Sequence, residues 1–191
     1  YYECPDLVHE MTEYIADFIL QLTRRALDEI PDLDFGILWE DMAMKTGPLI
    51  SPQLFRDFMM APMKRVTRTL NEYGIKIIMV DSDGNVDLLV PLWLEANVNL
   101  IYPLEVAADC DAFHYRSQYG KDVLLLGNID KRALRDGCSK KDIEREVMSK
   151  VPRLVKDGGF SPMVDHAVPP DVPFENFKYY IDLIHEVCTF K

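Results

Sequence analysis

Short apolar runs that end in acidic or amide residues restrict the fold of this chain more than any other feature. Five such runs alternate with segments of helical periodicity, and they lack the alternating polarity of strands that face water on one side. Strands of this kind are buried on both faces, and their strict alternation with helices indicates a parallel sheet. The five runs are LDFGILWED (33–41), IKIIMVDSD (75–83), NLIYPLE (99–105), DVLLLGNID (122–130) and FSPMVDH (160–166).

The segments between the runs predict helices. Apolar residues recur at helical spacing after Pro5, and Ser51 followed by Pro52 is a typical helix start. Pro62 is expected to kink or split the helix that begins there. The predicted helices cover residues 7–26, 51–74, 85–98, 106–120, 139–159 and 174–188.

Each run ends in side chains that can bind a metal ion or a substrate. Because the carboxyl ends of parallel strands lie at one edge of a sheet, residues far apart in sequence are expected to meet there. A single ending of this kind can be a turn, since Asp, Asn and Gly favour turns; five on one edge predict a site. The endings are Glu40 and Asp41, Asp81 and Asp83, Glu105, Asn128 and Asp130, and Asp165 and His166.

A closed barrel of parallel strands takes eight strands and about 250 residues, whereas this chain has 191 residues and five evident strands. We therefore expect residues 1–191 to form a single domain, the C-terminal five βα units of a (β/α)8 TIM barrel in a longer protein. The first residue, Tyr1, is not methionine, which agrees with this expectation. An open, doubly wound five-stranded sheet is the structural alternative.

Composition excludes several classes of partner. The net charge is −11, which argues against nucleic acid or an anionic membrane surface, because those require clustered positive charge. No apolar run approaches the roughly 18 residues that cross a bilayer. The four cysteines, at positions 4, 110, 138 and 188, are far apart and are expected to be reduced thiols of a cytoplasmic protein.

Four stretches carry a family likeness: WEDMAMKTGPLISPQLFRDF, DSDGNVDLLVPLWLEANVNLIYPLEVAA, YGKDVLLLGNIDKRAL and GGFSPMVDHAVPPDVPFENFKYYI. Together they resemble the uroporphyrinogen decarboxylase superfamily, which includes decarboxylases of haem biosynthesis and corrinoid-dependent methyltransferases. The match runs from about Leu33 to the C-terminus and keeps motif order and spacing. The resemblance implies a (β/α)8 barrel of which this chain is the C-terminal part.

The thiol methyltransferases of that superfamily bind zinc through His-x-Cys-Gly-Asn and a later Gly-Cys. Alignment on these motifs places their ligands on Asp81, Asp83 and His166, so the resemblance implies a metal site in which every ligand type has changed. Carboxylate and imidazole suit zinc and harder divalent ions. Asp81 and Asp83 alternate along an extended chain, so both side chains can face the mouth of the barrel, the opening at the carboxyl ends of its strands, while Ser82 points away.

The decarboxylases are cofactor-free, and they resemble this chain at GNID and at His166. Their substrate-clamping arginines belong to the N-terminal part of the barrel, outside this chain. For Asp83 and Gly84 a simple turn is the alternative to a site. Asn128 and Asp130 are balanced between loop architecture and substrate binding, and Lys131 and Arg132 are expected to be surface residues more than partners of the acids.

Three functions follow as expectations. The first is methyl transfer between a small-molecule substrate and a corrinoid held by a partner protein, with a divalent metal, zinc by preference. The alternatives are uroporphyrinogen decarboxylation and a non-catalytic fragment; self-association into a homo-oligomer is compatible with each. The expected roles are catalysis for His166, Asp83 and Glu40, and cofactor or substrate contacts for Asn85, Glu105, Asn128 and Asp130. Metal binding is expected for Asp81, Asp83 and His166, with Glu40 or Glu105 as a candidate further ligand.

Overall fold

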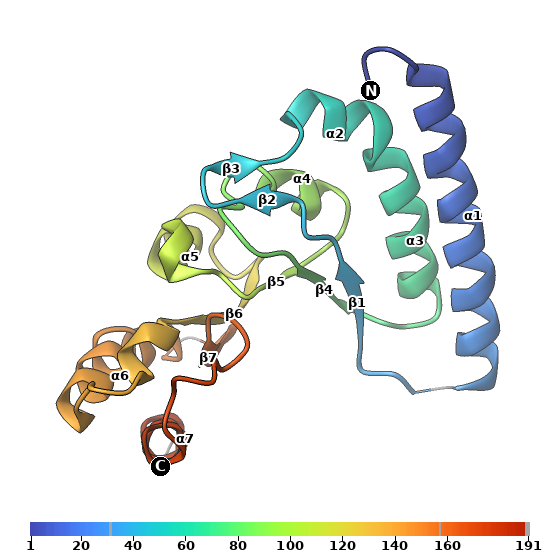
Figure 1. Cartoon of the computed structure of the whole chain (residues 1–191). Coiled ribbons are helices and arrows are strands. Elements are labelled where there is room, and N and C mark those ends of the chain that lie inside the picture. Colours follow the sequence, from blue (N-terminus) through green and yellow to red (C-terminus); the bar gives the residue numbers. More distant parts are fainter. Residues whose placement is uncertain (31, 157, 190–191) are drawn as a thin grey trace.

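A computed structural model describes residues 1–30, 32–156 and 158–189. Five parallel strands form one sheet, and their order in the sheet follows their order in the chain (Figure 1). A doubly wound sheet reverses its strand order at a switch point, so this order fits the wall of a barrel and not the structural alternative. The strands are β1 (Phe35–Trp39), β4 (Ile77–Asp81), β5 (Leu100–Tyr102), β6 (Leu124–Ile129) and β7 (Phe160–Val164). Each lies within one of the five predicted apolar runs.

The helices form the core with one face of the sheet. Ile78 and Val80 of β4 and Leu125 of β6 are at most 1% exposed and belong to a cluster shared with helix residues. Trp93 of α4, predicted to lie between helix and sheet, is fully buried in this cluster. The helices are α1 (Pro5–Glu29), α2 (Pro52–Phe58), α3 (Met60–Glu72), α4 (Val90–Glu95), α5 (Ala112–Tyr119), α6 (Lys140–Leu154) and α7 (Phe174–Cys188).

The opposite face of the sheet is apolar and open. It is hollowed by a cavity of about 500 Å³, and several of its side chains are more than one third exposed. A closed barrel would bury this face, because large apolar surfaces are rarely left in contact with water. The inward side chains that line the hollow include Phe35, Ile37, Ile77, Met79, Leu100 and Leu124.

Three predicted helices differ from those observed. The helix predicted over 51–74 breaks at Met59 into α2 and α3, one turn before Pro62, whose missing N–H removes a helical hydrogen bond. The segment 85–98 forms turns first and becomes helical only at Val90, next to Pro91. The segment 106–120 is a short 3-10 helix, η1 (Val106–Ala108), followed by α5, because Asp109 adopts a left-handed conformation (φ 64°) between them.

A small antiparallel hairpin was not predicted. It pairs β2 (Ala43–Met44) with β3 (Gly47–Pro48), and it lies above the end of β4 beside α4 (Figure 1). Two-residue strands are too short to give a periodic signal. Within the described part of the chain, none of the helices combines the length and the apolar character that crossing a membrane requires.

Gly127 in β6 provides a test of how closely the strand ends pack. Its φ is +114°, and a Cβ at this position would lie 1.9 Å from the carbonyl oxygen of Pro103. We expect Gly127→Ala to lower the free energy of unfolding by about 3 kcal/mol or more, since the clash is with backbone. Urea titration measures this loss.

Gly137→Ala is the matched control, because Gly137 also has positive φ (+85°) but nothing within 4 Å of its Cβ position. It should cost only about 1 kcal/mol of backbone strain. Equal losses in the two variants would show that the contact with Pro103 does not decide the stability.

Candidate active site

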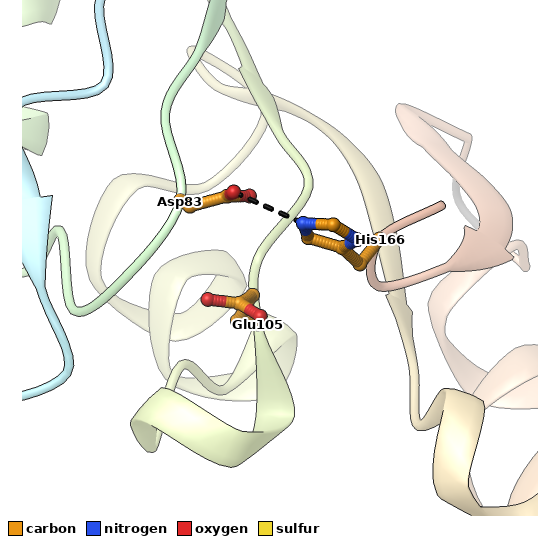
Figure 2. Close-up of side chains that lie close together, drawn as sticks. All are labelled: Asp83, Glu105 and His166. Atoms are coloured by element: carbon orange, nitrogen blue, oxygen red, sulfur yellow. Dashed lines mark hydrogen bonds and ion pairs between the residues drawn. The ribbon is translucent and has the colours of Figure 1, made fainter. Parts of the chain in front are cut away.

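Three side chains from three strand ends meet at the carboxyl edge of the sheet (Figure 2). Asp83 follows β4, Glu105 follows β5 and His166 follows β7. The Nε2 atom of His166 lies 3.1 Å from Oδ2 of Asp83, and one ligand atom from each of the three residues lies within 4.8 Å of the others. All three side chains are half-buried, so a ligand can reach them from the mouth.

The loop that carries Asp83 is fixed by the β2–β3 hairpin. Gly84 has a φ of +83°, and a Cβ there would lie 2.7 Å from the carbonyl oxygens of Ala43 and Met44. Only glycine fits this position. The Gly84 N–H donates to Oε2 of Glu105 at 3.0 Å. The backbone beside Asp83 therefore holds the second carboxylate in place.

Glu105 has a second partner, Lys131. The ammonium of Lys131 lies 3.1 Å from Oε1 of Glu105, and the lysine side chain is only 16% exposed. Burial alone raises the pKa of Glu105, but the hydrogen bond from Gly84 and the Lys131 ammonium outweigh it, so the pKa lies below its usual value. The expectation that Lys131 lies at the surface is therefore corrected: its charge is needed beside the acids.

Asp165 positions this group from behind. Its side chain is fully buried, and it accepts hydrogen bonds from the backbone N–H groups of Val106 (2.8 Å) and Lys131 (3.1 Å). The Lys131 ammonium lies 3.5 Å from the same carboxylate. Because Asp165 precedes His166 and Val106 follows Glu105, one carboxylate joins the backbone segments that carry two of the three side chains.

Asp81 is absent from the group that Asp83 forms. It is the last residue of β4, in register with Trp39 of β1 and Tyr102 of β5, whereas Asp83 lies two residues further on, in the loop. Burial raises the pKa of Asp81, and the nearby carboxylates of Asp83 and Asp41 raise it further. Its place in the strand ladder puts Asp81 one level deeper in the mouth than Asp83.

The predicted ligand set thus changes by one member. Glu105, expected to contact a cofactor, takes the place of Asp81 beside Asp83 and His166. The strand ladder fixes Asp81 at the level of the sheet, and the loop carries Asp83 beyond it. Ser82 points away as expected: it is 2% exposed, and its hydroxyl accepts the Met42 N–H.

Tyr102 was not predicted as a site residue. Burial raises the pKa of its hydroxyl, and the carboxylates of Asp81, Asp83 and Asp165 raise it further, which places the ring among the acids of the mouth. The predicted strand NLIYPLE already contained the information that places Tyr102 at the site. Strand alternation puts Tyr102 on the same face as Leu100, at the last level before the loop.

The side chains of Asn85, Asn128 and Asp130 are used within the loops. Asn85 donates to the carbonyl of Ala108 (2.9 Å). Asp130 accepts the Arg132 backbone N–H at 2.9 Å and three hydrogen bonds from the Arg132 guanidinium at 2.7 to 3.0 Å. Asn128 is 1% exposed, and its amide bonds three backbone groups, those of Leu104, Cys110 and Ala112. We expected these three side chains to contact a cofactor or substrate. Their hydrogen bonds show instead that they stabilise the loops in which they lie.

Glu40 does not face the mouth as expected. A Cβ at Gly36 of the same strand would lie 3.0 Å from the Leu70 side chain of α3, and alternation places Glu40 on that helix side too. Glu40 lines a largely apolar cavity of about 310 Å³ between α1, α3 and β1. Burial raises its pKa to about 7. The expected catalytic role of Glu40 is therefore corrected. The next residue, Asp41, is the one that contacts the site, since its Oδ1 accepts the Asp83 N–H at 3.2 Å.

The group fits a divalent metal by its donor set. Two carboxylates and an imidazole converge from three elements, and the Glu105 carboxylate is oriented by Gly84 and Lys131, as ligands of metal sites commonly are. Zinc accepts such a mixed set and keeps a further position for a substrate or water. Because two of the three ligands are carboxylate oxygens, the set favours zinc or a harder divalent ion over the softer metals that thiolates select.

Parallel strands in chain order, with polar side chains on the loops after their carboxyl ends, match the wall of an α/β barrel, the face where enzymes of that fold place their active sites. The chain belongs to the uroporphyrinogen decarboxylase (URO-D) family, whose profile matches residues 1–187. This confirms the resemblance and the fold class.

The relatives are similar over part of their length. A uroporphyrinogen decarboxylase of Legionella pneumophila (strain Paris) is 32% identical over 144 residues, which are 74% of this chain and 39% of that protein. One of Campylobacter lari is 23% identical over 198 residues, 97% of this chain and 53% of the relative. A solved methyltransferase from Methanosarcina mazei has a TM-score of 0.59 at 18% identity over 82% of this chain and 43% of its own. That last likeness is one of fold.

The position of Glu40 predicts a pH dependence of stability. Its pKa rises from 4.5 to about 7 on folding, so the folded protein holds a proton that the unfolded chain releases between these values. The free energy of unfolding should therefore fall as pH rises through this window, by up to about 3 kcal/mol. Urea unfolding at pH 5 and pH 8 measures the loss.

In Glu40→Gln this loss should disappear, so that the variant matches the parent near pH 5 and exceeds it at pH 8. Glu10→Gln, an exposed position on α1, is the control and should keep the parent profile. Parallel profiles for the parent and Glu40→Gln would contradict the burial of this carboxyl.

Proposed function

We propose that this chain carries the catalytic edge of a metal-dependent methyltransferase that moves a methyl group between a small molecule and a corrinoid on a partner protein. The observation that supports it is the group of Asp83, Glu105 and His166, whose ligand atoms lie within 4.8 Å of one another. Membership of the URO-D family supports an enzymatic role.

The roles of the side chains follow from their contacts. Asp83, Glu105 and His166 would hold the cation, while Lys131 and the Gly84 N–H keep the Glu105 carboxylate oriented. When bound, a divalent cation supplies a Lewis acid that makes the leaving oxygen or nitrogen less basic. None of the three ligands is a thiolate, which favours an oxygen- or nitrogen-linked methyl donor over a thiol acceptor.

The proposed transfer balances with a reduced corrinoid as co-substrate. A cobalt(I) corrinoid on the partner protein would supply the electron pair for the new bond to the methyl carbon, and the bond from that carbon to oxygen or nitrogen would break. The released electron pair stays on the heteroatom, which takes up a proton. The products are a methylated cobalt(III) corrinoid and a demethylated alcohol or amine.

Removal of single ligands tests the metal. In the intact protein, Asp83→Asn or His166→Ala should weaken zinc binding by about 100-fold or more, since loss of even an outer contact costs about 10- to 100-fold. Metal analysis by mass spectrometry and the zinc-induced rise in melting temperature provide the readouts. Asp182→Asn, on exposed α7, is the matched control. An intact protein without stoichiometric metal, or with the same affinity in all variants, would refute the proposal.

Decarboxylation of uroporphyrinogen is the second candidate. It is favoured by the names of the curated relatives, at up to 32% identity, and by His166 at the mouth. In that reaction a side-chain carboxylate leaves as carbon dioxide and its carbon takes up a proton. Electrostatic repulsion disfavours this reaction. A polyanionic substrate would be repelled, in a cleft of low dielectric, by the carboxylates of Asp81, Asp83 and Glu105.

Product analysis separates the two reactions. We expect the intact protein to form methylcobalamin, followed by its absorbance, from cob(I)alamin and a methoxy or methylamine donor. It should leave the acetate groups of uroporphyrinogen unchanged on chromatography. The opposite result would establish the decarboxylase, and inactivity in both assays would favour the non-catalytic alternative.

We also propose that the five strands belong to a closed barrel in a longer protein. The support is the open apolar face of the sheet and the share of the relatives that the chain spans, which is 39% for those of Legionella. The chain would then supply the wall that carries Asp83, Glu105 and His166, which we call the metal group. The remaining strands would cover the face of the sheet that is now exposed.

A further inference from the structure

A row of aromatic and acidic side chains lies one level below the metal group. Trp39, Asp81 and Tyr102 are in register across β1, β4 and β5. On each strand the residue two positions earlier lines the open inner face, and alternation places the row on that face as well. The earlier residues are Ile37, Met79 and Leu100.

The indole of Trp39 is anchored to the loop above it. Its Nε1 donates to Oδ2 of Asp41 at 3.2 Å, and Oδ1 of Asp41 accepts the Asp83 N–H at 3.2 Å. The polar edge of the ring is thus tied to the loop of the metal group, while 79% of the residue stays exposed. In the proposed barrel a further strand would pair with β1, and the Trp39 side chain, on the inner face by alternation, would then face the mouth.

The carboxylate of Asp81 supplies negative charge without an ion-pair partner among the described residues, although His166 is near enough to lower its pKa. Among the residues that the structure describes, Lys131 pairs with Glu105 and Asp165, and no cation lies within ion-pair distance of Asp81. A divalent ion would be balanced by Asp83 and Glu105. The row would therefore keep a net negative charge between two aromatic rings even when the metal group is loaded.

We infer that Trp39, Asp81 and Tyr102 bind a small alkylated ammonium ion, the cationic group of the methyl donor. Such an ion has no N–H to donate when it is fully methylated, so aromatic faces and a counter-charge are what recognise it. The row lies two strand positions below Asp83, about 7 Å. An oxygen a few bonds from the nitrogen would then reach the metal group.

As a statement about the substrate, this inference rests on the proposed methyltransferase; as a statement about binding, it can be tested alone. The probe is choline, and its control ligand is 3,3-dimethylbutan-1-ol, which has the same shape without the charge. Calorimetric titration into the intact protein should show choline binding at least tenfold tighter than the alcohol.

The variants separate the parts of the row. Asp81→Asn and Trp39→Leu should each weaken choline binding about tenfold or more, and Tyr102→Leu should weaken it too, whereas Tyr102→Phe keeps an aromatic face and should stay within about twofold. Asp182→Asn controls for general charge, and melting temperatures confirm that each variant is folded.

Metal analysis of the same proteins distinguishes this inference from the proposed function. Asp81→Asn should retain zinc, and Asp83→Asn should lose zinc while still binding choline. A parent protein that binds choline but holds no metal would overturn the methyltransferase and leave the cation site standing. Equal affinity for choline and the alcohol, or choline affinity unchanged in both Asp81→Asn and Trp39→Leu, would overturn the inference.

Discussion

The buried carboxylate of Asp165 is the contact on which the arrangement of the mouth depends. It accepts the N–H groups of Val106 and Lys131 and lies beside the Lys131 ammonium, so the ends of β5, β6 and β7 converge on one residue. A buried charge is costly unless it is satisfied in this way. Once it is, Glu105 and His166 have their positions set by the backbone, with little freedom left to lose when a ligand binds.

The sheet divides its two faces between stability and chemistry. Residues such as Ile78, Val80 and Leu125 pack against the helices with almost no exposure, and this side forms the core. The inner face carries apolar side chains below and polar ones at the rim, where Trp39, Asp81 and Tyr102 form the last level. The strand alternation that buries one face thus delivers reactive groups on the other.

Much of the fold was predictable from the sequence, because five apolar runs between helical segments leave few topologies. The strands, their parallel direction and the meeting of Asp83 with His166 follow from that pattern. Glu105 in place of Asp81, the burial of Lys131 and the displacement of Glu40 do not. They depend on how far each loop carries its residue past the strand end, and on hydrogen bonds such as that from Gly84 to Glu105. Such contacts join residues distant in sequence and leave no periodic trace.

The sequence separation of the three ligands has a consequence for folding. Asp83 and His166 are 83 positions apart, with Glu105 between them, so a cation shared by all three would close two long loops at once. Cross-links that close long loops restrict the unfolded chain most strongly, and a ligand that binds only the folded form stabilises it by mass action. Supply of the cation would therefore govern how long this edge of the protein survives, as well as what it catalyses.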